Sequence, residues 1–166
     1  MVVSIFGAMF APKPMDVAKE MVRVTRKGGK IVMGNWIPGD PTLVAQVLKI
    51  SSAYTPPPPE GFISPMLWGV ESHVIERFGQ AGVPPEKISM AKDTYYFVSA
   101  SKGPADFIGL FRRFYGPTMN AFEAAEQSGR AEELHSELLG LAKAHNKSTN
   151  DGTLIPATFL RVTVSL

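Results

Sequence analysis

Apolar residues along this chain recur with two different periods, which separates expected strands from expected helices. Four short runs are rich in β-branched and aromatic residues, which is typical of strands. They are 2–6, 30–36, 87–101 and 154–166. Other segments repeat their apolar residues at helical spacing. They are 14–25, a short stretch through 44–48, 65–81 and 105–147, the last of which has room for two or three helices.

The order of these segments predicts an α/β fold. The run 2–6 shows no polar alternation beyond Ser4, as in strands that are buried on both faces of a parallel sheet. A strand, a helix and a strand in succession over 2–36 predict a right-handed parallel crossover. The last two strands favour an antiparallel edge, and a helical insertion at about 104–148 joins them. We therefore expect a single domain, 1–166, with about four strands, two parallel plus an antiparallel edge pair, and flanking helices.

Composition excludes several classes of function. The net charge of +2 is too small to indicate a nucleic-acid-binding surface, and no basic run supports one. No segment approaches the roughly 20 consecutive apolar residues that span a membrane. No basic segment precedes the apolar start, as it would in a signal peptide. The absence of cysteine excludes disulfides and thiolate metal sites and fits the reducing cytoplasm. We expect a cytoplasmic protein without nucleic-acid or membrane partners.

The sequence indicates no metal site and no catalytic residue. His73, His135 and His145 have no ligand spacing with one another or with nearby acids, and the last two fall at helix positions expected to be exposed. No strand is followed by the Gly-x-Ser-x-Gly turn of a serine nucleophile. Glu126 and Arg130, at i and i+4, are expected to form an ordinary surface pair.

Three stretches carry a resemblance to a known family. They are Ser4–Pro12, Arg26–Ile31 and Asn35–Pro38. In this order they resemble the fourth strand, the glycine turn into the fifth strand and the following active-site loop of class I methyltransferases, which use S-adenosylmethionine. Lys27 replaces the proline that is usual in that turn.

The resemblance implies a transferase with a partial Rossmann-like methyltransferase sheet. The family sheet has seven strands in the order 3-2-1-4-5-7-6, with the seventh antiparallel, and this chain is similar to strands four to seven. The family holds its cofactor with a glycine-rich turn after strand one and an acidic residue at the end of strand two, by the logic of dinucleotide sites. Neither is found here, because Gly28-Gly29 follows a helix and caps it.

We therefore expect a methyltransferase-like protein that lacks the cofactor-binding N-terminal half and is inactive alone. It is expected to bind S-adenosylmethionine weakly or not at all. The alternative is a small-molecule-binding or dimeric interaction module derived from a methyltransferase.

Phe6 and Gly7 are the candidate cofactor-binding residues. They match family positions beside the methionine part of the cofactor, and they end the first strand, where open α/β sheets bind their ligands. The alternative is that Phe6 belongs to the core and Gly7 makes a tight turn.

Aromatic side chains suggest a substrate pocket. Trp36 ends the second strand, and Trp68 follows the proline-rich loop. With Tyr54 and Phe62 they could form a pocket for an apolar, uncharged substrate. The alternative is that they pack beneath the loop.

The segment 111–120 is rich in side chains that bind ligands. In the family, insertions at this place often form a lid over the substrate. Arg112 or Arg113 could hold a carboxylate or a phosphate, and Tyr115 and Asn120 could form hydrogen bonds. The alternative is a solvated arginine face beside a helix break.

The first strand also predicts a partner. In the resembling fold it would be internal, so an apolar edge at Val2–Phe6 would attract another strand. We expect a homodimer in which two such strands pair antiparallel across a two-fold axis, or a separate chain that supplies the missing half.

Overall fold

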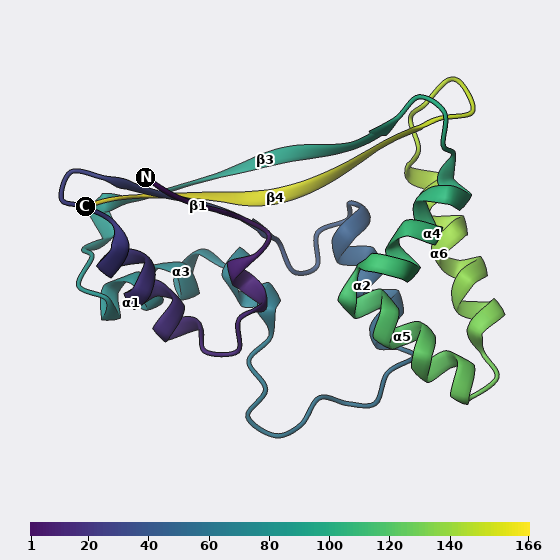
Figure 1. The fold of residues 1–166 in the computed structure, drawn as a ribbon, viewed down its shortest axis with the longest axis horizontal. Helices are drawn as coiled ribbons and strands as arrows, with labels where there is room; N and C mark the ends of the chain where they lie inside the picture. The colour runs from purple at the N-terminus through teal and green to yellow at the C-terminus, as the bar shows by residue number, and fades with distance from the viewer. The chain divides into compact units, whose positions relative to one another are not determined.

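The computed structural model describes residues 1–166, and its elements follow the expected order (Figure 1). The strands are β1 (Val2–Ile5), β2 (Lys30–Trp36), β3 (Ile88–Ser99) and β4 (Thr153–Ser165). The α-helices are α1 (Pro14–Val24), α2 (Leu43–Ser52), α3 (Glu71–Gln80), α4 (Pro104–Phe114), α5 (Gly116–Gln127) and α6 (Ala131–His145). The 3-10 helices are η1 (Ala8–Phe10), η2 (Pro65–Gly69) and η3 (Pro85–Lys87).

The strands form one mixed sheet in the order β1-β2-β4-β3. β1 and β2 are parallel, with Val2 opposite Ile31, which confirms the predicted parallel crossover. β4 runs antiparallel to β2, with Trp36 opposite Phe159. The predicted α/β class with about four strands and flanking helices is therefore confirmed, and the arrangement is consistent with a Rossmann-like fold.

The chain divides into two compact units. The first comprises residues 1–38, 61–93 and 158–166, and the second comprises 39–60 and 94–157. Both β3 and β4 contribute residues to each unit. Helices α4, α5 and α6, which occupy the expected insertion, all belong to the second unit.

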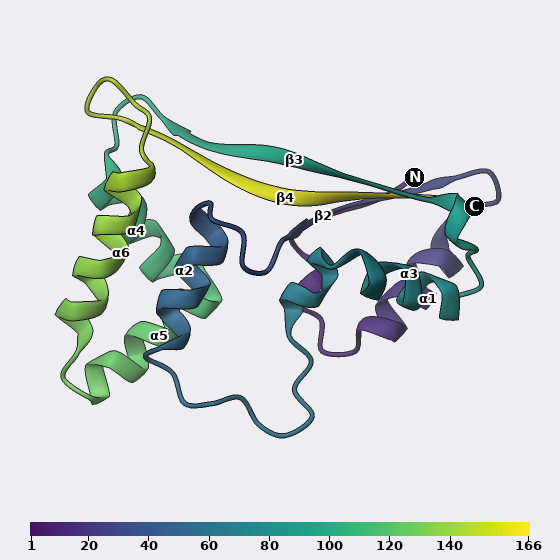
Figure 2. The ribbon, with the colours of Figure 1, turned by 180° about the vertical axis from the view of Figure 1, so that it is seen from behind.

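In the first unit, helices α1 and α3 lie on one side of the sheet (Figure 2). Five apolar side chains at alternate positions of β2 and β4 share the face of the sheet that is covered. They are Ile31, Met33, Leu160, Val162 and Val164, all at most 1% exposed. On β1, Val3 and Ile5 point to the other face and are 53% and 51% exposed. The prediction that the first strand is buried on both faces is therefore wrong.

The segment predicted as one helix over 65–81 is divided in the structure. η2 ends at Gly69 and α3 begins at Glu71, because Val70 between them has extended backbone angles. Apolar spacing continues across this break, so periodicity alone does not reveal it.

In the second unit, α2 packs against α5 and α6, and α4 packs against the same two helices. Side chains of these helices that are at most 2% exposed make up the core. They are Leu43, Val44, Val47, Ile108, Thr118, Ala121, Phe122, Ala125, Leu134, Leu138 and Ala142. His135 and His145, expected to be exposed, are half-buried on α6. None of the helices in either unit has the length and apolar character needed to cross a membrane.

Candidate functional site

Phe6 and Gly7 lie where β1 ends, as expected. Phe6 is the one non-glycine residue with a positive φ, at 58°. Its N–H donates to the Gly34 carbonyl oxygen at 2.9 Å, and the Ala8 N–H donates to Ser4 Oγ at 2.9 Å. The Phe6 amide is thus bonded to β2, and the Ala8 amide is bonded to the side chain of Ser4.

An aromatic cluster occupies the carboxyl ends of β1 and β2. The rings of Phe6 and Trp36 stack at 3.6 Å with 5° between their planes. The ring of Phe159, which lies opposite Trp36 in the register, meets both edge-on at 5.4 and 6.4 Å. We call Phe6, Trp36 and Phe159 the end cluster. Trp36 is 4% exposed and the other two residues are half-buried, so the apolar surface of the cluster belongs to Phe6 and Phe159. The cluster holds no titratable group and cannot transfer a proton.

The side chains of the two tryptophans have different partners. Trp68, on η2, is 1% exposed, lies beneath the Arg77 guanidinium and meets the Phe78 ring edge-on at 6.0 Å. Phe62 is 54% exposed. Trp68 therefore lies in the core of the first unit, and Trp36, which is 4% exposed, is buried within the end cluster.

Arg77 is a buried residue that sequence reasoning missed. It is 2% exposed, its guanidinium carbon lies 4.5 Å from the centre of the Trp68 ring, and its Nε and Nη1 have no hydrogen-bond partner. Burial lowers the pKa of the guanidinium. The available signal was its place next to Phe78 and three residues after Val74, on the inward stripe of α3.

Tyr54 belongs to the second unit and joins the end of α2 to α6. Its hydroxyl donates to Glu137 Oε1 at 2.7 Å, and the Arg130 guanidinium lies 4.3 Å from its ring centre. Burial and the Glu137 carboxylate together raise the pKa of the Tyr54 phenol to about 12. Arg130 pairs with Glu133 at 2.8 Å, so the predicted pair with Glu126 is wrong.

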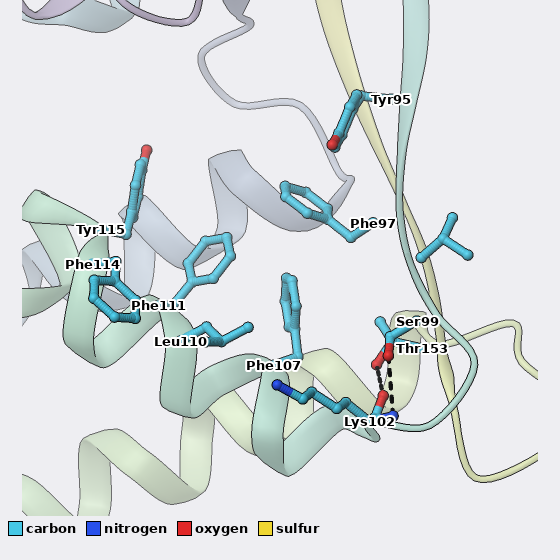
Figure 3. A pocket seen from close by; sticks show the side chains of 11 residues that line it. Tyr95, Phe97, Ser99, Lys102, Phe107, Leu110, Phe111, Phe114, Tyr115 and Thr153 are labelled. Carbon is cyan, nitrogen blue, oxygen red and sulfur yellow. Dashed lines mark hydrogen bonds between the residues drawn. The ribbon is translucent and has the colours of Figure 1, made fainter.

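The second unit holds a cavity of about 350 Å³ between β3 and α4 (Figure 3). Its wall is a series of aromatic rings. The centre of the Phe97 ring, on β3, lies 5.1 Å from that of Phe107 and 5.7 Å from that of Phe111, both on α4. The ring centres of Phe107 and Phe111 are 4.7 Å apart. The series continues to Tyr95 on β3 and to Tyr115 after α4. We call this cavity the aromatic pocket.

Lys102 is the one charged residue in the lining of the aromatic pocket. Two hydrogen bonds fix its backbone. Its N–H donates to Ser99 Oγ at 3.0 Å, and its carbonyl oxygen accepts from Thr153 Oγ1 at 2.7 Å. The next residue, Gly103, donates to the Asp106 carboxylate at 3.2 Å as α4 begins. Backbone contacts thus hold Lys102 at the junction of β3 and α4.

The residues predicted in the segment 111–120 separate. Tyr115 lines the aromatic pocket, and burial raises the pKa of its phenol. Arg112 instead pairs with Glu126 at 2.8 Å and lies over the Phe122 ring. Arg113 lies over the ring of Phe114, and Asn120 is exposed on α5.

The apolar stripe of α4 was the feature of the sequence that could have indicated this pocket. Phe107, Leu110, Phe111 and Phe114 share one stripe, yet Leu110 and Phe114 are 41% and 69% exposed. The stripe therefore lines a surface cavity as well as the core. No group of three or more His, Cys, Asp or Glu side chains comes together as a metal site would require.

Comparison with known proteins finds relatives in mycobacteria. The chain is 31% identical over 129 residues to the uncharacterized proteins Rv1403c of Mycobacterium tuberculosis and Mb1438c of Mycobacterium bovis, which covers 76% of this chain and 44% of each relative. It is 30% identical over 142 residues to the uncharacterized protein Rv1405c of Mycobacterium tuberculosis, covering 85% and 50%. The chain spans about half the length of the curated relatives it matches. No family model matches it.

Proposed function

We propose that the chain forms the acceptor side of a class I methyltransferase fold and does not hold S-adenosylmethionine by itself. The observation that carries this proposal is the strand order. Strands β1, β2, β4 and β3 lie side by side, with the first two parallel and β4 antiparallel to β2. The resemblance implies the same order for strands four, five, seven and six.

The position of the end cluster supports the proposal. Phe6 and Trp36 end the two parallel strands, and ligands of open α/β sheets bind at the carboxyl ends of such strands. When bound, S-adenosylmethionine supplies a methyl group for in-line displacement, which depends mainly on positioning. A planar apolar surface without a general base suits that task.

The described residues do not fit the adenosyl part of the cofactor. After β1, the Phe6 N–H donates to the Gly34 carbonyl oxygen on β2, while the N–H groups of Ala8 and Phe10 donate within the turn. Gly28 donates its N–H to Leu166, and Gly29 donates to Arg26. Neither turn leaves a row of amides for a nucleotide. The greater length of the relatives leaves room for the remaining strands of such a sheet.

A chimaera that carries this chain in place of the matched part of Rv1403c tests the proposal. Calorimetry with S-adenosylhomocysteine should show binding by intact Rv1403c and by the chimaera. The isolated chain should bind about 100-fold more weakly or not at all. Phe6→Ala in the chimaera should weaken binding, while Val24→Ala, at an exposed position of α1, should not.

Two results would contradict the proposal. If Rv1403c and the chimaera are folded but bind neither S-adenosylmethionine nor S-adenosylhomocysteine, the chain is not part of a methyltransferase site. If the isolated chain binds as tightly as the chimaera, the described residues do hold the adenosyl group and the assignment of an acceptor side is wrong.

A further inference from the structure

We propose that the aromatic pocket binds a small planar aromatic acid, namely a compound of about two fused rings that carries one carboxylate. The pocket is lined by residues of the second unit alone. The proposal therefore does not depend on methyl transfer, and it would stand if the proposed function failed.

The shape and lining of the pocket favour a flat apolar ligand. Its volume of about 350 Å³ lies at the lower end of the range for small-molecule sites. Phe97, Phe107 and Phe111 turn their rings toward the same space, as Figure 3 shows. Aromatic rings prefer offset or edge-on partners at these separations, so a planar ligand would extend the series.

The rim of the pocket carries apolar surface that is left in water. Leu110 is 41% exposed and Phe114 is 69% exposed, although both belong to the stripe that lines the cavity. Contiguous exposed apolar surface beside a cavity is typical of binding sites. A ligand seated in the pocket would cover part of this surface.

The charge of the pocket indicates that the ligand is an acid. Lys102 belongs to none of the ion pairs in the structure, and no aspartate or glutamate lines the cavity. In Figure 3 its side chain extends from the junction of β3 and α4 toward the base of Phe107. Ser99 and Thr153 fix the backbone of Lys102, so the root of its side chain lies at the edge of the cavity. A single ammonium beside an apolar wall complements one carboxylate.

Titration of the full chain with 2-naphthoate, followed by calorimetry, tests the proposal. We expect one site with a dissociation constant below about 1 mM, and binding of the neutral 2-naphthamide at least about fivefold weaker. Lys102→Ala should weaken the binding of 2-naphthoate by about fivefold to tenfold and leave the affinity for 2-naphthamide unchanged. Lys102→Arg should retain most of the affinity for the acid.

Two further variants locate the site. Leu110→Trp would fill the cavity from its exposed rim and should abolish binding of both probes. Lys143→Ala removes an exposed lysine of α6 outside the pocket, so it should leave the affinities for both probes unchanged. Circular dichroism verifies that each variant is folded.

Any of three results would overturn the proposal. They are no binding of 2-naphthoate by the wild-type chain at about 1 mM, equal affinities of the wild-type chain for the acid and the amide, and unchanged binding by folded Leu110→Trp. If that variant does not fold, the Lys102 variants and the comparison of acid with amide still decide the matter.

Discussion

At the scale of single residues, Phe6 is held in a conformation that its side chain disfavours. A left-handed backbone costs a non-glycine residue about 1–2 kcal/mol. Stacking on Trp36, the edge of Phe159 and the hydrogen bond to Gly34 offset this cost, since aromatic pairs contribute about 0.5–1.5 kcal/mol each. The end cluster therefore maintains the turn that leads the chain out of β1.

At position 6, a glycine variant should be more stable than an alanine variant, which is the reverse of the order at an ordinary strand position. Both Phe6→Gly and Phe6→Ala lose the stacked ring, but only glycine adopts φ 58° without strain. We expect the glycine variant to be more stable by about 1 kcal/mol in urea unfolding. At Val3, an ordinary strand position, alanine should be the more stable of the two. A more stable alanine variant at both positions would show that Phe6 is not strained.

At the scale of elements, close contact between η2 and β2 decides where the helical segment breaks. A Cβ on Gly69 would overlap the carbonyl oxygen of Trp36. The backbone of η2 therefore reaches β2 only because residue 69 has no side chain. The sequence showed the glycine but not the strand that it approaches.

Alanine substitutions at two glycines separate this contact from helix propensity. Gly69→Ala should lower the free energy of unfolding by roughly 1–3 kcal/mol, because η2 must move away from β2. Gly79→Ala, on α3 with nothing near the added carbon, should raise it by up to about 1 kcal/mol. Thermal and urea unfolding measure both. If Gly69→Ala leaves the free energy of unfolding unchanged, η2 moves away from β2 without loss of stability.

At the scale of the whole molecule, β1 lies at an edge of the sheet. The strand order leaves β1 with a partner on one side only, and its Val3 and Ile5 are about half exposed. Such an edge is a template for a second strand. The expectation of an antiparallel pair across a two-fold axis stays a prediction.

Light scattering at micromolar concentration should therefore give the mass of a dimer. Ile5→Lys places a charge at this edge and should shift the protein toward the monomer. Ile75→Lys, which replaces an exposed apolar residue of α3, is the matched control and should leave the mass unchanged. A monomeric wild-type protein, or equal dissociation by both variants, would rule out pairing through β1.

Local patterns in the sequence determined the elements and their order. The second strand begins and ends where predicted, at Lys30 and Trp36, and α1 ends one residue before the predicted Thr25. Side-chain period, capping residues and turn glycines act over a few neighbouring residues, so they can be read without a structure. The strand order followed from the family resemblance rather than from these patterns.

Tertiary structure alone decided which side chains meet. It exposed one face of β1, buried Arg77 against Trp68, stacked Phe6 on Trp36 and brought β3 and α4 together around the aromatic pocket. Each of these outcomes depends on the register of paired strands or on packing between segments far apart in the chain. Such contacts leave no local period, because the partner that fixes each side chain is not its neighbour in the sequence.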